Sequence, residues 1–211
     1  MTTIFFDLDG TLTNPKAGIT RSIQYALDRL DQAVPTEDEL TWCIGPPLLP
    51  SLKKLVGSDD LADQALLLYR ERFSDVGLFE NELYPGIVET LSSIARPGRR
   101  LFVATSKPTV YAEPIVKHFG LAGYFERVFG SELDGRRVDK TDLLAYALQT
   151  TGVDPSQATM IGDRSHDMVG ARNNAMTAVG VLYGFGSEAE LVAAGAHRIC
   201  ATPRELIAHT G

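Results

Sequence analysis

Two carboxylates stand one residue apart near the start of the sequence. Asp7 and Asp9 follow the apolar run 4–6. Like charges this close repel each other, and burial strengthens the repulsion, so either water surrounds them or something positive lies between them. Alternate residues of an extended chain face the same way, which lets both carboxylates approach one substrate. We expect Gly10 to let the backbone turn closely, with its amide pointing toward an anion.

Further polar side chains follow later apolar runs of the chain. Thr105 and Ser106 follow "RLFVA", Asp163 follows "ATMIG", Asp167 comes four residues later, and Lys140 opens a helical pattern. Each has an ordinary structural explanation by itself, such as a helix cap or a solvated lysine. In open parallel sheets, however, ligands bind beyond the carboxyl ends of the strands. Carboxylate oxygens are the ligands that Mg²⁺ prefers, so we expect Mg²⁺ between Asp7 and Asp163.

The elements that position these residues follow from the pattern of apolar residues. Continuous apolar runs alternate with helical spacing, which predicts an α/β fold with a parallel sheet covered by helices on both faces. We predict strands at residues 1–8, 100–105, 127–130, 158–162, 177–182 and 198–200. A helix is predicted over residues 110–119, and because proline suits a first turn, Pro114 indicates that it begins late.

A helical block interrupts this pattern after the first strand. Between residue 18 and about residue 79 the apolar spacing is helical, which predicts about four helices. Thr36 and Glu39 form a capping-box pattern before one helix, residues 48–56 begin another, and Ser58 can cap a longer one. We therefore predict two domains: an α/β core of residues 1–14 and 83–211, and a helical cap of residues 15–82.

The motifs in this order resemble the haloacid dehalogenase superfamily. The resemblance is carried by "DLDGT", then Thr105, then Lys140, then "GDRSHD", while "YPGI" and "YFERVFGSE" resemble its phosphoglycolate phosphatase-like branch. It covers nearly the whole chain. It implies a Rossmann-like parallel sheet flanked by helices, with an inserted helical cap, and a hydrolase that acts on phosphoric monoesters.

The resemblance also implies a role for each core residue. Asp7 would attack phosphorus and become a phosphoaspartate, and Asp9 would act as general acid and base. Thr105 would donate a hydrogen bond to the phosphoryl group, and Lys140 would offset its charge and that of Asp7. Asp163 would bind Mg²⁺ together with Asp7 and the Asp9 backbone carbonyl.

Other residues are candidates for contacts around this centre. Asp167 would touch the ion or hold its waters, and Gly10 and Ser106 would lie near the substrate. In the cap, Arg21 is a candidate partner for a second anionic group of the substrate, and Gly45 for a close backbone approach. Ser106 stands where many relatives have asparagine, and Lys140 is followed by threonine where many have proline, which leaves the shape of both loops open.

Composition bounds the partners. A net charge of −7 argues against sequence-independent nucleic-acid binding. We see no segment of the ~18 apolar residues that a membrane span needs and no signal peptide, and two cysteines without a pair motif suit a reduced, cytoplasmic protein. We expect a monomer or weak homodimer that acts on a small phosphorylated metabolite, either phosphoglycolate-like or nucleotide-like.

Several alternatives remain. Within the same fold, a β-phosphoglucomutase-like phosphosugar mutase and a 5′-nucleotidase or pyrophosphatase fit the same motifs. Asp9 argues against a dehalogenase, because the superfamily members that cleave carbon–halogen bonds do not keep this second aspartate. A signalling receiver domain would carry its aspartate after a middle strand, and a catalytically idle binding protein would not be expected to retain the complete set of residues.

Overall fold

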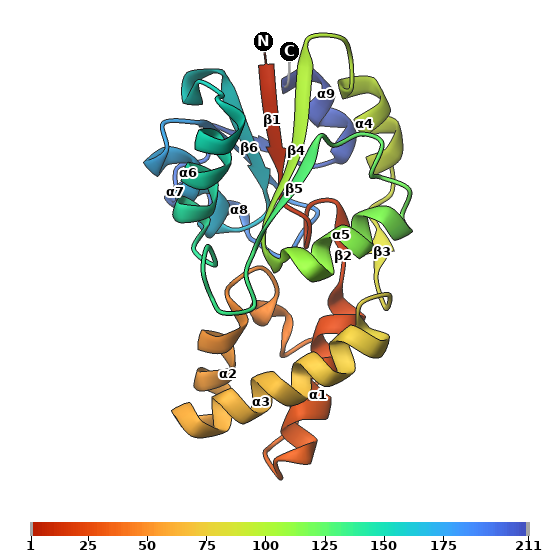
Figure 1. Cartoon of the computed structure of the whole chain (residues 1–211), viewed down its shortest axis with the longest axis vertical. Coiled ribbons are helices and arrows are strands. Elements are labelled where there is room, and N and C mark those ends of the chain that lie inside the picture. Colours follow the sequence, from red (N-terminus) through yellow and green to blue (C-terminus); the bar gives the residue numbers. More distant parts are fainter. Residues whose placement is uncertain (1, 210–211) are drawn as a thin grey trace. The chain divides into compact units, whose positions relative to one another are not determined.

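The computed structural model describes residues 2–209, which form two compact units. One unit comprises the chain up to Asn14 and from Leu83 onward, and the other comprises Pro15–Glu82. Figure 1 shows the elements in chain order. Among the described residues, the two-residue strands β2 (Thr13–Asn14) and β3 (Glu82–Leu83) pair as a small separate sheet.

The first unit is built on a parallel sheet, as predicted. Its strands in the described chain run in the order β5-β4-β1-β6-β7-β8. They are β1 (Thr2–Phe6), β4 (Arg99–Pro108), β5 (Arg127–Ser131), β6 (Ala158–Gly162), β7 (Thr177–Val181) and β8 (Arg198–Cys200). Phe6 pairs with Val103 of β4 and with Ile161 of β6, so the residues after these three strands meet at one edge of the sheet.

Helices cover both faces of this sheet. Figure 1 shows α6 (Lys140–Thr151) and α7 (Ser165–Asn173) on one side, and α4 (Ile87–Ile94) and α9 (Leu206–His209) on the other. The remaining helices of this unit are α5 (Thr109–His118) and α8 (Glu188–Ala193). The fold class predicted from the sequence, an α/β sheet flanked by helices, is confirmed.

The core on the α6 and α7 side is apolar and tightly interlocked. Phe5 of β1 stacks on Phe102 of β4 at 5.1 Å between ring centroids, and Phe129 of β5 lies 5.8 Å from Phe102. Leu143 and Leu144 of α6 complete this cluster and are fully buried. Burial of such side chains stabilises each by roughly 1.5–3 kcal/mol and fixes β1 and β4 under the site.

The start of α5 was predicted wrongly. The helix begins at Thr109, so Pro114 lies in its interior rather than in its first turn. Pro114 has no N–H for the carbonyl four residues earlier, that of Val110. Val110 as a residue is 56% exposed, so this turn of the helix faces solvent, where a carbonyl that lacks its helical partner costs least.

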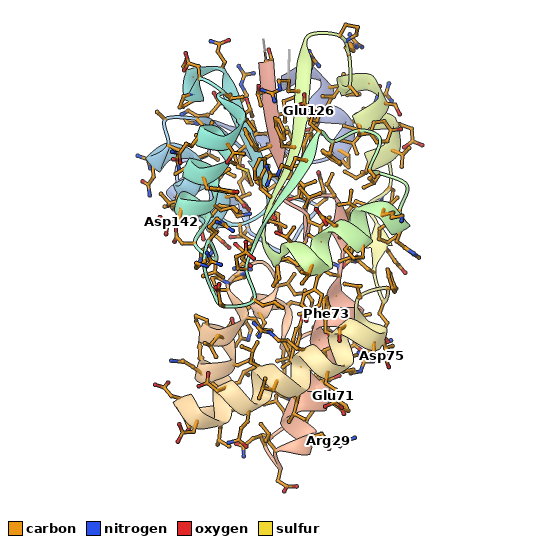
Figure 2. The ribbon with its side chains drawn as sticks, in the orientation of Figure 1. Arg29, Glu71, Phe73, Asp75, Glu126 and Asp142 are labelled. Atoms are coloured by element: carbon orange, nitrogen blue, oxygen red, sulfur yellow. The ribbon has the colours of Figure 1, made fainter. Side chains whose placement is uncertain are left out.

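The second unit, Pro15–Glu82, is helical. It contains α1 (Lys16–Arg29), α2 (Leu48–Val56) and α3 (Asp59–Arg72), with a 3₁₀ turn at Thr41–Cys43 and a π-helical turn at Phe73–Gly77. Ser58 caps α3 as predicted, accepting a hydrogen bond from the Leu61 amide. Tyr69 and Phe73 stack with ring centroids 5.2 Å apart at the end of α3, where Figure 2 labels Phe73.

The helix expected after Thr36 does not form. The capping box itself is present: the Thr36 amide donates to Glu39 Oε2 at 2.9 Å, and the Glu39 amide donates to Thr36 Oγ1 at 3.3 Å. The chain then makes only turns and the short 3₁₀ segment before Gly45, whose φ is 96°. Two prolines follow this glycine, so too few residues remain for an α-helix to propagate.

Candidate active site

Asp7 lies directly beyond the end of β1. Its amide continues the sheet by donating to the Ile161 carbonyl at 2.9 Å, which fixes the backbone at this point. Its side-chain Oδ1 accepts a hydrogen bond from the Leu8 amide at 2.8 Å and lies 3.1 Å from Lys140 Nζ. The carboxylate is buried, so these contacts rather than solvent stabilise its charge.

Lys140 links two carboxylates to the sheet. Its Nζ lies 2.8 Å from Asp167 Oδ1 and donates to the Ala104 carbonyl of β4 at 3.0 Å. Asp139 caps α6 by accepting from the amides of the first turn, which places Lys140 at the first helical position. Burial alone would lower the pKa of Lys140, but the charges of Asp167 and Asp7 outweigh it and raise the pKa, so the ammonium stays charged.

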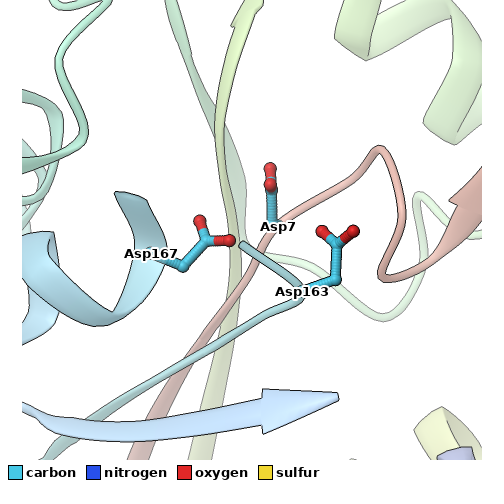
Figure 3. Close-up of side chains that lie close together, drawn as sticks. All are labelled: Asp7, Asp163 and Asp167. Atoms are coloured by element: carbon cyan, nitrogen blue, oxygen red, sulfur yellow. The ribbon is translucent and has the colours of Figure 1, made fainter. Parts of the chain in front are cut away.

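Three buried carboxylates converge at this edge of the sheet (Figure 3). Asp7, Asp163 and Asp167 each offer an oxygen, and these oxygens lie within 4.8 Å of one another. Burial, together with the charges of Asp167 and Asp7, raises the pKa of Asp163 well above its usual range. Burial also raises the pKa of Asp167, to about 6, although Lys140 opposes the shift.

The carboxylate cluster fits a divalent cation. Asp163 Oδ2 accepts from the Phe185 amide at 2.8 Å, whereas the buried Asp163 Oδ1 has no hydrogen-bond partner among the described residues. A buried polar atom without a partner costs about 1–3 kcal/mol unless a ligand satisfies it. Counting Asp9, four buried carboxyl groups face the ammonium groups of Lys107 and Lys140, so ionisation of all four would leave two negative charges uncompensated. One Mg²⁺ would balance them with the hard oxygen ligands it prefers.

Asp9 is held by a lysine that the sequence analysis did not assign. Lys107 Nζ lies 2.8 Å from Asp9, and both side chains are buried. Burial raises the pKa of Asp9, and the charge of Lys107 opposes this shift only in part. The only signal for Lys107 in the sequence was its position two residues after Thr105, at the end of the "RLFVAT" run.

Thr105 and Ser106 lie at the end of β4. Thr105 Oγ1 is buried and accepts a hydrogen bond from the Lys107 amide at 3.3 Å, which leaves the hydroxyl hydrogen to donate elsewhere. The Ser106 carbonyl accepts a hydrogen bond from Ser131 Oγ at 2.7 Å, which joins the last residues of β4 to the end of β5. Thr105 is therefore hydrogen-bonded to the backbone of Lys107, whose side chain pairs with Asp9, and the Ser106 carbonyl is bonded to β5.

The expectation for the Gly10 amide was wrong. That amide donates to the Thr13 carbonyl at 2.8 Å and closes the turn after Asp9, so it does not point toward an anion. Gly10 has φ of 83°, and a Cβ there would lie 2.1 Å from Asp163 Oδ2. Glycine is required at this position because the turn needs positive φ and because Asp163 takes the space.

Arg21 and Gly45 belong to the helical unit, Pro15–Glu82. The Arg21 guanidinium lies 3.0 Å from Glu37 and 3.3 Å from Glu80, and its side chain is 48% exposed. Gly45 stands in the turn before two prolines, with positive φ. Their suggested contacts with a substrate stay predictions.

The family follows from comparison with known proteins. The model of the haloacid dehalogenase-like hydrolases matches residues 4–181. The chain belongs to this family. The resemblance inferred from the motifs is therefore confirmed, and the protein is a hydrolase of phosphoric monoesters.

Three similar proteins carry different names. A 5′-nucleotidase of Pseudomonas aeruginosa is 47% identical over 94% of this chain and 90% of its own. A tyrosine-protein kinase PtkA of Mycobacterium tuberculosis is 39% identical over 87% of this chain, but this chain spans only 62% of that protein. A phosphoglycolate phosphatase of Caulobacter vibrioides is 33% identical over 88% of this chain and 81% of its own.

Solved structures agree with the fold. A predicted phosphatase from Clostridium acetobutylicum superposes with a TM-score of 0.95 at 42% identity, covering 99% of this chain and 97% of that one. Among the residues that the structure describes, no helix is both long and apolar enough to cross a membrane.

Proposed function

We propose that the protein is a Mg²⁺-dependent phosphatase that hydrolyses a small phosphomonoester through a phosphoaspartate on Asp7. One observation carries the proposal: Asp7 lies beside a charged lysine and two further buried carboxylates, and within residues 2–209 the Oδ1 atom of one of them, Asp163, has no hydrogen-bond partner. Such an arrangement suits a nucleophile that must approach an anionic phosphoryl group in the presence of a cation.

The first step transfers the phosphoryl group to Asp7. A carboxylate oxygen of Asp7 forms a bond to phosphorus while the ester P–O bond breaks, and Asp9 gives its proton to the departing alkoxide oxygen. Asp7 and Asp163, with Asp167 beside them, would hold Mg²⁺, which would supply positive charge to offset that of the phosphoryl oxygens and the carboxylates. Lys140 holds Asp7 in place, and Thr105 donates a hydrogen bond to a phosphoryl oxygen.

The second step returns the enzyme to its starting state. Asp9, now ionised, takes a proton from a water molecule, whose oxygen attacks phosphorus as the bond to Asp7 breaks. Free phosphate leaves, and Asp9 is protonated again for the next cycle. A raised pKa for Asp9, caused by burial, supports this role because a general acid works best when its pKa lies closer to neutrality.

The substrate is proposed to be a 5′-nucleoside monophosphate, with phosphoglycolate-like compounds as the second candidate. The order rests on similarity, since the relative named 5′-nucleotidase is 47% identical and the one named phosphoglycolate phosphatase is 33% identical. A phosphosugar mutase would use the same four aspartates and lysine but would return the phosphoryl group to a sugar phosphate. A pyrophosphatase would differ only in its leaving group.

Two measurements test the proposal. Rapid acid quench of the enzyme with a ³²P-labelled nucleotide should give a protein-bound label that hydroxylamine releases, and Asp7→Asn should give none. A kinetic panel of nucleoside monophosphates, phosphoglycolate, pyrophosphate and glucose 1-phosphate, with and without a sugar bisphosphate, ranks the substrates. Normal turnover by Asp7→Asn would contradict the nucleophile, a need for the bisphosphate would favour the mutase, and net transfer from ATP to a tyrosine peptide would contradict hydrolysis.

A further inference from the structure

Residues 182–186, with the sequence "LYGFG", form a loop that follows β7 and precedes α8. Two contacts fix the beginning of this loop. The Leu182 amide donates to the Cys200 carbonyl at the end of β8 at 2.9 Å. The Tyr183 ring packs edge-on against Tyr84, with centroids 5.0 Å apart. The loop is therefore held by the sheet and by an aromatic contact.

The loop closes tightly around Asp163. The Phe185 amide donates to Asp163 Oδ2 at 2.8 Å. A Cβ on Gly184 would lie 2.4 Å from Asp163 Cβ and 2.3 Å from the Gly10 carbonyl oxygen, and a Cβ on Gly186 would lie 1.9 Å from the Asp163 carbonyl oxygen. Neither glycine has positive φ, so lack of space, and not backbone conformation, excludes a side chain at these two positions.

These contacts place the two carboxylate oxygens of Asp163 in different environments. Oδ2 accepts a hydrogen bond from the loop. Oδ1 is buried and has no hydrogen-bond partner among the described residues, and its carboxylate forms a cluster with those of Asp7 and Asp167. We propose that residues 182–186 are a positioning loop: they hold the Asp163 carboxylate in one rotamer, so that Oδ1 is presented to the divalent cation. Groups that orient a metal ligand typically change metal affinity about 10–100-fold when they are removed.

This inference rests on the proposed Mg²⁺-dependent reaction, but it concerns binding alone and is tested without substrate. The variant is Gly184→Ala, whose added methyl group must displace Asp163 or the Gly10 backbone. The matched control is Gly123→Ala, because Gly123 also lacks positive φ and a Cβ there would meet nothing within 4 Å. Circular dichroism and thermal unfolding verify that both variants are folded.

Binding of Mn²⁺, as a paramagnetic substitute for Mg²⁺, is measured from the free-ion electron paramagnetic resonance signal. We expect the dissociation constant of Gly184→Ala to rise at least about tenfold and that of the Gly123→Ala control to stay within about twofold. Unchanged Mn²⁺ affinity in folded Gly184→Ala would overturn the proposal. An inactive wild type that still binds Mn²⁺ with this pattern would count against the phosphatase and not against the positioning loop.

A second measurement decides the matter if Gly184→Ala does not fold. In ¹⁵N-labelled wild type, amide exchange of Phe185 is compared with that in Asp163→Ala, which lacks the acceptor and should fold because it removes one of several crowded, buried carboxyl groups. We expect exchange of this amide to be at least about tenfold faster in the variant, since the hydrogen bond that protects it is lost. Equal exchange would mean that the loop does not hold the carboxylate.

Discussion

The two units of the molecule each contain a cluster of ion pairs, and the clusters differ in how their charges are balanced. In the helical unit, Glu80 accepts hydrogen bonds from Arg72 and Arg21, and the side chains of Arg72 and Glu80 are about one-fifth exposed. In the α/β unit, Lys140 lies between Asp7 and Asp167, and none of these three side chains is more than 5% exposed.

The difference appears in the titration of the acidic groups. Hydrogen bonds from Arg72, and in smaller part from Arg21, lower the pKa of Glu80 despite partial burial. Burial raises the pKa of Asp163, and its neighbours Asp167 and Asp7 raise it further. The cluster around Glu80, in which arginines balance the carboxylates, stabilises the helical unit. A buried cluster with excess negative charge is costly and is retained where a cation or substrate completes it.

The largest expected effect is the dependence of activity on Mg²⁺, because we expect only the buried cluster of the α/β unit to bind this ion. Activity should be absolutely dependent on Mg²⁺, so excess chelator should abolish turnover and added Mg²⁺ should restore it. Ca²⁺ should inhibit the enzyme. It is larger than Mg²⁺ and takes more ligands, so it would bind both oxygens of Asp7 and leave neither free to attack phosphorus. Steady-state kinetics across Mg²⁺ and Ca²⁺ concentrations measures both effects.

Asp163→Ala provides the matching variant, and Arg72→Met provides the control. The first should lose activity at ordinary Mg²⁺ concentration and lose the rise in melting temperature that Mg²⁺ gives the wild type, since only the folded cluster binds the ion. The second should keep that rise. Full activity of the wild type in excess chelator would remove the metal from the mechanism.

The next effect compares the loss of one cation from each cluster. Lys140→Met leaves two buried carboxylates facing each other, so the free energy of unfolding should fall by about 3–5 kcal/mol. Arg72→Met removes a partly exposed pair and should cost about 1 kcal/mol. Urea unfolding at pH 7 in the presence of chelator measures both.

Turnover provides the second readout for this pair. Lys140→Met should lower kcat by at least about 10²–10³-fold, as expected when one charged donor is removed from a site that develops negative charge. Arg72→Met should leave the chemical step intact. If Lys140→Met and Arg72→Met lowered the free energy of unfolding equally, the buried cluster around Lys140 would depend on its cation no more than the partly exposed cluster around Glu80.

A smaller effect lies in the pH dependence of stability. The folded-state pKa of Asp167 is raised by burial to about 6, so the folded protein binds a proton there more tightly than the unfolded chain. The resulting stabilisation is fully present below the unfolded pKa, near 4, and is lost as pH rises to about 6, amounting to at most about 3 kcal/mol. Glu80 has a lowered pKa and contributes with the opposite sign, because its stabilisation is lost as pH falls.

Denaturant unfolding of the metal-free protein between pH 4 and pH 7 tests this contrast. Asp167→Asn should remove a component that falls with rising pH, and Glu80→Gln should remove one that rises. The Asp167→Asn profile should therefore lie flatter or slope upward relative to wild type. Parallel profiles for wild type and Asp167→Asn would show that this carboxyl titrates alike in the folded and unfolded states.

The sequence was sufficient to predict those parts of the fold in which an apolar run forms a strand and the parallel sheet then fixes where the strand ends. The apolar runs 158–162 and 198–200 are strands with those bounds, and the parallel arrangement brings Asp7 and Asp163 to one edge. The capping box at Thr36 shows the limit of a local rule, because its hydrogen bonds form and yet no α-helix follows.

The parts of the site that could not be predicted depend on irregular backbone and on contacts distant in sequence. β4 continues past Thr105 to Pro108 with a shift in register against β5, and this irregular end brings Lys107 to Asp9. A periodic pattern contains no such shift. The hydrogen bond of the Phe185 amide to Asp163 joins residues 22 positions apart, and it depends on the close approach of Gly184 to Asp163, which no local pattern in the sequence indicates.

The smallest effect concerns the surface cluster of the helical unit, in which Arg21 pairs with Glu37 and Glu80, and the proposed role of Arg21 in substrate specificity. Arg21→Ala removes pairs with Glu37 and Glu80, and because its side chain is 48% exposed, the free energy of unfolding should fall only slightly. We nevertheless expect kcat/KM for a substrate with a second anionic group, such as phosphoglycolate, to fall more than kcat/KM for p-nitrophenyl phosphate, which has none.

Arg29→Ala is the matched control, since Arg29 is an exposed arginine of the same helix α1 that lies over the Tyr25 ring at 4.8 Å (Figure 2). It removes the same charge from the same unit without breaking an acidic pair, so it accounts for any general electrostatic change. A specificity ratio that shifts in Arg21→Ala and stays constant in Arg29→Ala assigns Arg21 to substrate recognition. An equal ratio in both variants leaves Arg21 with its two carboxylate partners, and the surface cluster is then purely structural, in contrast to the buried one.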